Sequence, residues 1–421
     1  MTVSFHRPTV DSILTSAQEI YVSACATEIG DAPDLLRKSS PRGGIVTGIF
    51  SPLINRRSYA DAEIGLRTRS FFLSKELKND LALGLVDYLP WRYNMIDRWL
   101  SQPGRFDTAM VMVSPPDHLG NCSLGVQTDF LPSFIKNVER LIGFVNPNIP
   151  RTLGDGDVPY SSFAAIVDYD LPLKTLQQKG PDAAAIRISE AIAELVEDNS
   201  TVQFGIGQIP SQVIARLTNH RGLRVHSGIV DDRILELEES GAIDRSQPIV
   251  TGTAIGSQAL YDELDRNGRF LFKTVTYTHG ADTIRSHQRF MAINSVLQAD
   301  LFGQVSAEGN MGKLIASPGG LPDFARGALE SPGGKSIIAV RARSASGVSP
   351  GIVPMLDRPH TATSGAVDAD IIVTEYGAAH VRNLSMDARA EAMIGIADPA
   401  DRDQLWEHWR EIRSNMFKIG G

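Results

Sequence analysis

The sequence predicts an α/β protein built from two α/β domains with mostly parallel sheets. Three observations support this: a length of 421 residues, apolar runs of strand length that alternate with helical segments, and glycine turns that follow strands. A chain of this length exceeds what one compact core normally holds, so two or more domains are expected. Strands that alternate with helices are typical of parallel sheets.

A linker is expected at residues 172–182, where PLKTLQQKGPD separates two stretches of similar texture. Proline, glycine and polar residues are common in segments that join domains. We therefore expect an N-terminal domain over residues 1–180 and a C-terminal domain over residues 181–421.

The first half contains two clear strand candidates. Residues 105–113 (RFDTAMVMV) form an apolar run of strand length, and the Ser-Pro-Pro-Asp that follows ends it. A glycine-bearing loop then continues to Gly125. Residues 140–145 form a second short strand, which ends at an Asn-Pro pair.

The second half opens with a helix that begins at Pro181-Asp182 and places Ile188, Ile192 and Leu195 on one face. Residues 201–204 are expected to form a strand, residues 205–210 a turn, and residues 211–217 the next helix. Further buried strands are expected at residues 223–226, 270–277, 336–340 and 370–374.

Charge and composition exclude several classes of function. The net charge is −8 and no lysine- or arginine-rich block occurs, so nucleic acid is a poor candidate partner. No run of 18 apolar residues occurs, which argues against a membrane span. The first residues lack an apolar signal core. We therefore expect a cytoplasmic protein.

Metal and disulfide chemistry are not expected. The two cysteines, Cys25 and Cys122, lie far apart without the spacing of metal ligands. Cys122 is more simply a small packing residue than a nucleophile. Histidines are scattered, and none forms an i, i+4 pair with a glutamate between them; examples are His118, His226, His279 and His360.

The glycine turn GIGQIP at residues 205–210 is the first candidate site, because it lies between a predicted strand and a predicted helix. Small residues let a ligand approach the backbone, and a helix N-terminus offers free N–H groups and a positive dipole end. Such a turn suits a phosphate or the oxyanion of a thioester under attack. An ordinary tight turn without a ligand remains equally open. Pro210 argues against a dinucleotide site, where glycine or alanine is needed.

A second candidate lies at residues 291–324, where Glu308 occupies a glycine-flanked loop and Gly319-Gly320 precede Pro-Asp-Phe. A carboxylate beside glycines can stand close to a bound acyl group. Loop acids such as Glu308 and Asp323 more often cap helices or tie down loops, and composition favours that alternative. Glu375 follows a buried strand, where a role in a site or a purely structural role is open.

Longer segments carry a resemblance to a known family. They keep their order from about residue 70 to residue 405 and include VSPPDHLGNCSLGV, FVNPNIPRT, VQFGIGQIPSQVIARL, AINSVLQADLFGQVSAEG, GGLPDFARGA and VTEYGAAHVRNL. The chain resembles the acetyl-CoA hydrolase/transferase family, a branch of the class I coenzyme A transferases that includes 4-hydroxybutyrate CoA-transferase. Many matching strings in one order are more specific than any one of them.

The resemblance implies a class I CoA-transferase-like fold with the active site at the domain interface. It implies acyl-CoA and carboxylate substrates, coenzyme A as substrate rather than a permanently bound cofactor, and a homodimer. A glutamate of such enzymes attacks the thioester and forms an acyl-glutamyl anhydride, then a glutamyl-CoA thioester. The resemblance assigns the binding of CoA and of the oxyanion to two glycine segments: Gly205, Ile206, Gly207, Gln208 and Ile209, and then Gly319 and Gly320.

One departure from the family affects the chemistry directly. The family nucleophile lies in a segment that reads roughly H-T-E-M-x-S-D-G, whereas this chain reads HSGIVDDR from residue 226. Gly228 therefore occupies the position expected to hold glutamate. Three consequences are open: direct attack by water or a substrate carboxylate, recruitment of another acid, or binding of CoA esters without turnover. Glu308 is the first candidate for such an acid, with Asp231 or Asp232 behind it.

A smaller departure lies at residues 349–352 (SPGI), where the family usually has serine–arginine–isoleucine. Loss of that arginine would change how a carboxylate or a phosphate is held. Together these features predict an acyl-CoA transferase or hydrolase that moves CoA between short-chain carboxylic acids. The alternative is a non-catalytic CoA-ester-binding paralogue or partner subunit that lacks the glutamate nucleophile.

Overall fold

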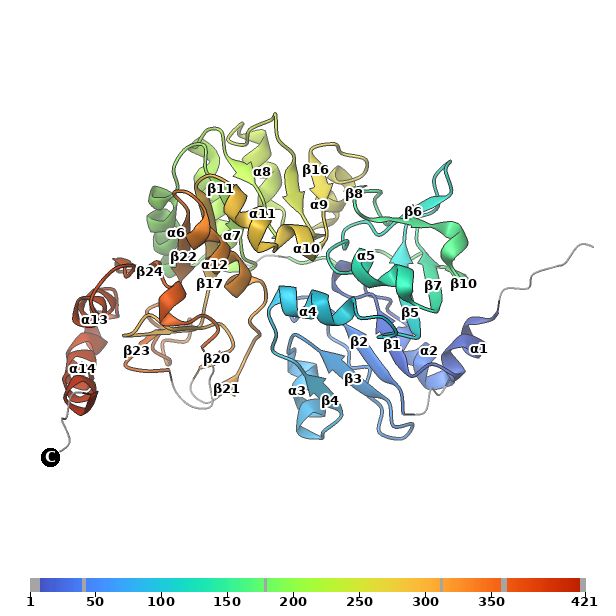
Figure 1. Cartoon of the computed structure of the whole chain (residues 1–421), viewed down its shortest axis with the longest axis horizontal. Coiled ribbons are helices and arrows are strands. Elements are labelled where there is room, and N and C mark those ends of the chain that lie inside the picture. The colour runs from blue at the N-terminus through green and yellow to red at the C-terminus, as the bar shows by residue number, and fades with distance from the viewer. Residues whose placement is uncertain (1–7, 40–42, 178–179, 311–312, 357–361, 417–421) are drawn as a thin grey trace, which may run out of the picture. The chain divides into compact units, whose positions relative to one another are not determined.

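The computed structural model (Figure 1) describes residues 8–39, 43–177, 180–310, 313–356 and 362–416. The chain divides into two compact units, which we describe separately. Unit 1 comprises Met1–Gln177, Gly228–Asp232 and Pro248–Thr278, and unit 2 comprises Gln178–Ser227, Arg233–Gln247 and His279–Gly421. Two segments from the second half of the sequence thus pack with the first half. The domain boundary at residue 180 stays a prediction.

Unit 1 is built on a seven-stranded sheet whose neighbouring strands all pair in parallel. Its strand order is β10-β7-β5-β1-β2-β3-β4. Every residue of β5 is buried, as expected for a strand covered on both faces. The strands are β1 (Glu19–Val22), β2 (Ile45–Gly48), β3 (Arg67–Ser70), β4 (Val86–Tyr88), β5 (Thr108–Val113), β7 (Arg140–Val145) and β10 (Ala165–Asp168).

Unit 1 also contains helices and short strands outside this sheet. The side chains of Thr9, Ser74 and Ser257 cap three of the helices. The helices are α1 (Val10–Thr15), α2 (Ala32–Ser39), α3 (Lys75–Ala82), α4 (Tyr93–Leu100), α5 (Leu131–Phe134), α9 (Gln258–Glu263) and α10 (Val275–Thr278). The short strands are β6 (Asn121–Ser123), β8 (Leu153–Gly154), β9 (Asp157–Pro159), β13 (Ile229–Val230), β14 (Ile249–Thr251), β15 (Thr253–Ala254) and β16 (Phe270–Phe272).

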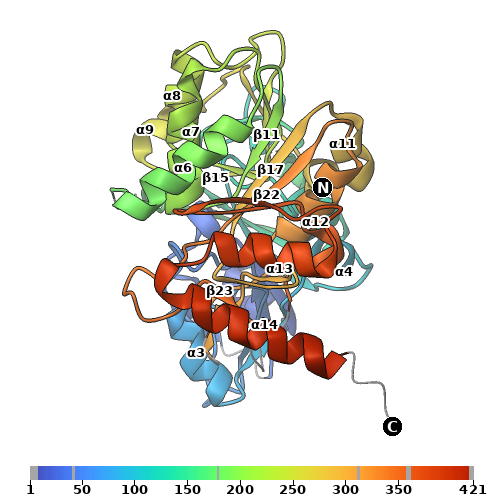
Figure 2. The same ribbon diagram turned by 90° about the vertical axis from the view of Figure 1, so that its left-hand side faces the viewer.

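Unit 2 is built on a six-stranded sheet of order β12-β11-β17-β22-β24-β25, parallel except for the last pair. Its strands are β11 (Thr201–Phe204), β12 (Arg224–Val225), β17 (Phe290–Ser295), β22 (Lys335–Ala339), β24 (Ile371–Thr374) and β25 (Gly377–His380). Figure 2 shows helices α6 (Ala183–Leu195) and α7 (Gln208–Arg216) side by side next to this sheet. The other helices are α8 (Arg233–Glu239), α11 (Ala281–Ser286), α12 (Leu321–Glu330), α13 (Met386–Gly395) and α14 (Arg402–Met416).

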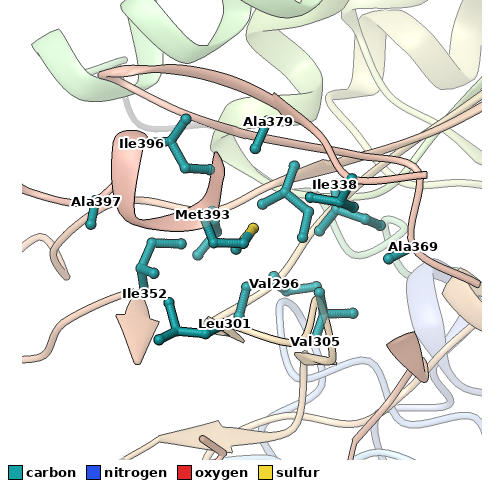
Figure 3. Packing of buried hydrophobic residues seen from close by; sticks show 14 of the residues in the cluster. Val296, Leu301, Val305, Ile338, Ile352, Ala369, Ala379, Met393, Ile396 and Ala397 are labelled. Carbon is teal, nitrogen blue, oxygen red and sulfur yellow. The ribbon is translucent and has the colours of Figure 1, made fainter. Parts of the chain in front are cut away.

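The largest apolar cluster described in unit 2 lies under its C-terminal helices. Figure 3 shows Met393 of α13 among aliphatic side chains that include Ile338 of β22 and Val296, which follows β17. Three short strands, β18 (Gln298–Asp300), β19 (Val305–Ser306) and β23 (Ile352–Val353), form a small sheet beside it. Burial of these side chains removes apolar surface from water and holds the strand ends in place.

The predicted α/β class and the mostly parallel sheets are confirmed, and three expected elements were wrong in part. The strand expected at residues 105–113 begins at Thr108. The strand expected at residues 270–277 ends at Phe272, and α10 follows. There the Asp155 carboxylate accepts a hydrogen bond from the Thr274 N–H at 3.2 Å, which turns the chain. The helix expected at 211–217 begins earlier, at Gln208. Pro210 fits its first turn because no helical bond needs the missing N–H there.

None of the helices described is both long and apolar enough to cross a membrane.

Candidate active site

The glycine turn of unit 2 follows β11 at the carboxyl edge of the sheet, where α/β proteins commonly bind ligands. The Gly205 N–H donates to the Ile293 carbonyl of β17 at 2.8 Å. A Cβ atom at Gly205 would stand 3.1 Å from the amide oxygen of Asn294, closer than most real Cβ contacts. The absence of a side chain at Gly205 therefore lets the chain pass close to β17.

Gly207 gives the turn its unusual backbone. Its φ of 126° and ψ of −179° lie in a region that only glycine enters readily. Among the residues that the structure describes, no atom outside its immediate chain neighbours lies within 4 Å of the place where its Cβ would be. Conformation rather than crowding therefore demands glycine here.

The first turn of α7 supplies hydrogen-bond donors. The first helical bond runs from the Ser211 N–H to the Gly207 carbonyl at 3.1 Å. Helical bonding leaves earlier N–H groups without a partner, and Pro210 has none. The amides of Gln208 and Ile209 are thus available to an anionic oxygen, favoured by the helix dipole.

Hydrogen bonds from polar side chains hold the ends of β11 and β17, which flank this turn. The Ser227 hydroxyl donates to the Phe204 carbonyl at 3.1 Å. The amides of Gln203 and Asn294 exchange two hydrogen bonds, at 3.0 and 3.3 Å, and both side chains are buried. Satisfied buried amides fix the strand ends that carry the turn.

The second glycine segment, Gly319-Gly320, immediately precedes α12. A Cβ atom at Gly320 would collide with the imidazole of His279, whose ring also lies 4.4 Å from the Phe324 ring centroid. Burial, with a smaller contribution from the neighbouring His226, lowers the pKa of His279 to about 3. Because α12 packs on β17 and β22 and leads into the start of β22, its N-terminal end lies towards the carboxyl edge of the sheet, which also carries the first turn.

Glu308 lies in the loop between β19 and β20 (Gly309–Asn310), with 6% of its surface exposed. Its carboxylate accepts a hydrogen bond from the Thr363 hydroxyl at 3.1 Å. Its carbonyl accepts from the N–H groups of Ile315 and Ala316 at 2.7 and 2.9 Å. These contacts suit an acid that ties down its loop, and a catalytic role for Glu308 stays a prediction.

Gly228 belongs to unit 1, whereas both glycine segments and Glu308 belong to unit 2. Its carbonyl accepts from the N–H groups of Gly252 and Thr253 at 3.2 and 3.1 Å. The nearby Asp232 carboxylate is engaged by Ser257, accepting from both its N–H and its hydroxyl. Asp231 is buried.

Asp129 is a buried acid close to Gly228 that the sequence did not reveal. Its carboxylate accepts from the Thr253 hydroxyl at 2.9 Å and the Phe130 N–H at 2.7 Å, and burial raises its pKa to about 7. Its own N–H donates to the Gly252 carbonyl at 3.0 Å. The contact with Thr253 spans 124 positions, which no local pattern could indicate.

Two further segments explain features noted in the sequence. The Glu375 carboxylate accepts from the Ala342 N–H at 2.9 Å, which ties the loop after β22 to the end of β24. A side chain at Gly351 would collide with the Arg341 carbonyl. The backbone therefore leaves no room for a side chain at Gly351.

Comparisons with known proteins agree with this architecture. Residues 37–176 match the acetyl-CoA hydrolase/transferase N-terminal domain, and residues 256–409 match the C-terminal domain of the same name. The chain belongs to the acetyl-CoA hydrolase/transferase family. The predicted family is confirmed, and with it the class of function, an enzyme that transfers or hydrolyses acyl-CoA thioesters.

Individual relatives are similar along most of the chain. The 4-hydroxybutyrate coenzyme A transferase of Clostridium kluyveri is 34% identical over 82% of this chain and 82% of its own length. A succinyl-CoA:acetate/propanoyl-CoA:succinate CoA transferase of Fasciola hepatica is 31% identical over 82% and 74%. The crystal structure of RipA from Yersinia pestis aligns with a TM-score of 0.86 at 28% identity, covering 96% and 97% of the two chains.

Proposed function

We propose that this protein is an acyl-CoA transferase or hydrolase for short, carboxylate-bearing acyl groups, and that water or an acceptor carboxylate attacks the thioester directly. The glycine turn before α7 carries this proposal. Gly207 has a backbone conformation that disfavours other residues, at the carboxyl edge of a sheet, directly before a helix N-terminus. A turn that served only to join a strand to a helix would not need that conformation.

The turn suits the charge that forms during thioester attack. When a nucleophile adds to the carbonyl carbon, negative charge develops on its oxygen, and the N–H groups of Gln208 and Ile209 would stabilise it. One such donor typically contributes about 10²- to 10³-fold in rate. The C–S bond then breaks, the electron pair leaves with the CoA sulfur, and the new C–O bond remains.

Direct attack accounts for both activities of the family. Attack by water gives the free acid, and the proton released goes to the CoA thiolate or to solvent. Attack by an acceptor carboxylate gives a mixed anhydride and CoA thiolate. The thiolate then attacks the acceptor carbonyl, which forms the new thioester and releases the donor acid.

The residues at the candidate nucleophile positions favour this route over a substitute nucleophile. Gly228 has no side chain to acylate, Asp232 is held by Ser257, and Glu308 accepts from Thr363. Glu308 remains the first candidate if an enzyme-bound acyl group forms.

Trapping with borohydride tests the route. The protein is incubated with acetyl-CoA and succinate and then with sodium borohydride, and tryptic peptides are measured by mass spectrometry. We expect acetyl-CoA to be consumed, giving free CoA or succinyl-CoA, without a labelled carboxyl group. Reduction of Glu308 or another acid would show a covalent intermediate and contradict direct attack. Binding of acetyl-CoA without its consumption, in the presence of the acceptor acid, would contradict an enzymatic function.

Restoring the family acid provides a second test. Gly228→Glu should raise transferase activity and create a carboxyl group that borohydride traps, provided that the variant melts like the wild type. No gain in a folded variant would count against an intact acyl site. Glu308→Gln should retain turnover, and its loss would instead place Glu308 in the chemistry.

The relatives' names include 4-hydroxybutyrate and succinyl-CoA:acetate CoA transferases, which guides the choice of test substrates. We infer similar small acids for this chain, a cytoplasmic location and a homodimer. Two buried free cysteines are consistent with a reducing compartment. Light scattering coupled to size-exclusion chromatography would measure the assembly directly.

A further inference from the structure

The start of α7 is held by an arginine that lies far from it in sequence. Arg341 follows β22, and its guanidinium donates one hydrogen bond to the Gln208 side-chain oxygen at 2.6 Å. A second bond goes to the Asp182 carboxylate at 2.8 Å. The Gln208 amide nitrogen donates to the Gly180 carbonyl at 2.7 Å. Both ends of the Gln208 side chain are therefore engaged.

These contacts join three elements of unit 2. Gln208 is the first residue of α7, Asp182 is the N-cap of α6, and Arg341 comes from the end of β22. Figure 2 shows α6 and α7 lying next to each other, and α6 packs against β24, the neighbour of β22 in the sheet. The side chain of Arg341 is 18% exposed and that of Asp182 is 47% exposed, so solvent partly screens this ion pair.

The charge of Asp182 agrees with this arrangement. The hydrogen bond from Arg341 and the capping contact with the Ala185 N–H lower the pKa of the Asp182 carboxyl, so it is ionised at neutral pH. The charge of Arg341 is thus balanced by Asp182, so Arg341 acts on the turn by holding the Gln208 side chain in place. It fixes the residue that immediately follows Gly207, whose backbone conformation otherwise has the freedom of glycine.

We propose that Arg341 is a positioning residue that, through Gln208, sets the direction of the first-turn amides of α7 toward a bound thioester. This inference rests on the proposed function, in which those amides stabilise the oxyanion. Misplacing donors that act only in the transition state lowers kcat more than it raises KM. The planar guanidinium reaches two acceptors at once, which lysine cannot do in the same way.

A double-mutant cycle tests the pair by steady-state hydrolysis and transfer of acetyl-CoA and succinyl-CoA. Arg341→Met and Gln208→Ala should each lower kcat about 10- to 100-fold with KM within about threefold. The kcat of the double variant should be no more than about threefold below that of the less active single variant, because the two residues act as a unit. Arg341→Lys should recover part of the loss. Arg326→Met is the control, since it removes another arginine–aspartate pair of unit 2, with Asp368.

Unchanged kcat in Arg341→Met, or single effects that multiply in the double variant, would overturn the inference while the proposed function stands. Amide hydrogen exchange of peptides covering residues 205–214 gives a readout that needs no turnover. Arg341→Met should exchange faster there than the wild type and Arg326→Met, and equal exchange would overturn the inference. A wild type without turnover would instead refute the proposed function, and the exchange data would still decide whether Arg341 fixes the turn.

Discussion

Two glycine turns of unit 2 look alike in sequence but need glycine for different reasons. Before α7, Gly207 adopts φ 126° with open space where its Cβ would be. Before α12, the φ of Gly320 is −85°, which any residue adopts, but the His279 imidazole occupies the place of its Cβ. The first turn therefore keeps its backbone open to a ligand, whereas the second is closed by packing. Substitutions should separate these two roles.

The largest effect is expected for Gly207→Ala, on activity. Alanine at this φ and ψ costs about 1–3 kcal/mol, so the turn should relax and move the amides of α7. We expect kcat to fall at least about 100-fold, as for the loss of an oxyanion donor. Gly347→Ala is the control, because Gly347 also has a positive φ, 74°, and open space around it. An equal fall of kcat in both variants would mean that backbone strain anywhere in unit 2 is enough to lower activity.

Gly320→Ala should act on stability instead. Its Cβ would stand 2.8 Å from Cδ2 of His279, so the ring must shift against Phe324. Overpacking of this kind costs about 1–3 kcal/mol. Chemical denaturation monitored by circular dichroism measures the change. If the Gly320→Ala variant proves as stable as the wild type, the ring must move freely.

The buried imidazole should make stability depend on pH. The folded pKa of His279 is about 3 and its unfolded value is about 6.5, so the unfolded chain binds the extra proton between these values. This contribution is therefore complete above pH 6.5 and is lost as the pH falls towards 3. Between pH 7.5 and 5 the wild type should lose about 1–2 kcal/mol more than His279→Gln. Parallel pH profiles would contradict a neutral buried ring.

Asp129 should contribute in the opposite direction. Its folded pKa of about 7 exceeds its ordinary value of 3.8, so its contribution is complete below pH 3.8 and is lost as the pH rises through 7. Asp129→Asn should therefore be relatively more stable than the wild type at pH 8 than at pH 5. Denaturation at both pH values measures this difference, and an equal difference at both would show that burial does not govern this acid.

The smallest effect is expected for Gly319→Asn. Gly319 has φ 60°, which asparagine tolerates, and no neighbour would meet its Cβ within 4 Å. The free energy of unfolding should change by less than about 1 kcal/mol. A larger loss would mean that the second turn also depends on a backbone that only glycine allows.

Much of the fold could be predicted from local patterns. The strand at residues 201–204 and the helix capped by Asp182 depend on neighbouring residues, and both occur where expected. The glycine turn also occurs, but it ends at Gly207 because α7 begins at Gln208. The strand expected at residues 270–277 failed because Asp155, which is distant in sequence, turns the chain after Phe272. The spacing of apolar residues and the secondary-structure propensity of each residue carry no information on contacts between distant parts of the sequence.

The candidate site could be predicted only in part. The glycine segments are visible as motifs, but the sequence does not distinguish the conformational need at Gly207 from the crowding at Gly320. The pairing of Arg341 with Gln208 spans 133 positions, and that of Asp129 with Thr253 spans 124. Residues of this kind become recognisable only once the strands that carry them are paired.

A crystal structure of the wild type with a non-hydrolysable thioester analogue, in which a methylene group replaces the CoA sulfur, tests the central claim most directly. We predict that the acyl oxygen lies about 2.7–3.1 Å from the backbone nitrogen of Gln208 or Ile209. An acyl group bound away from the start of α7, or side chains of unit 2 packed over those nitrogens, would contradict it.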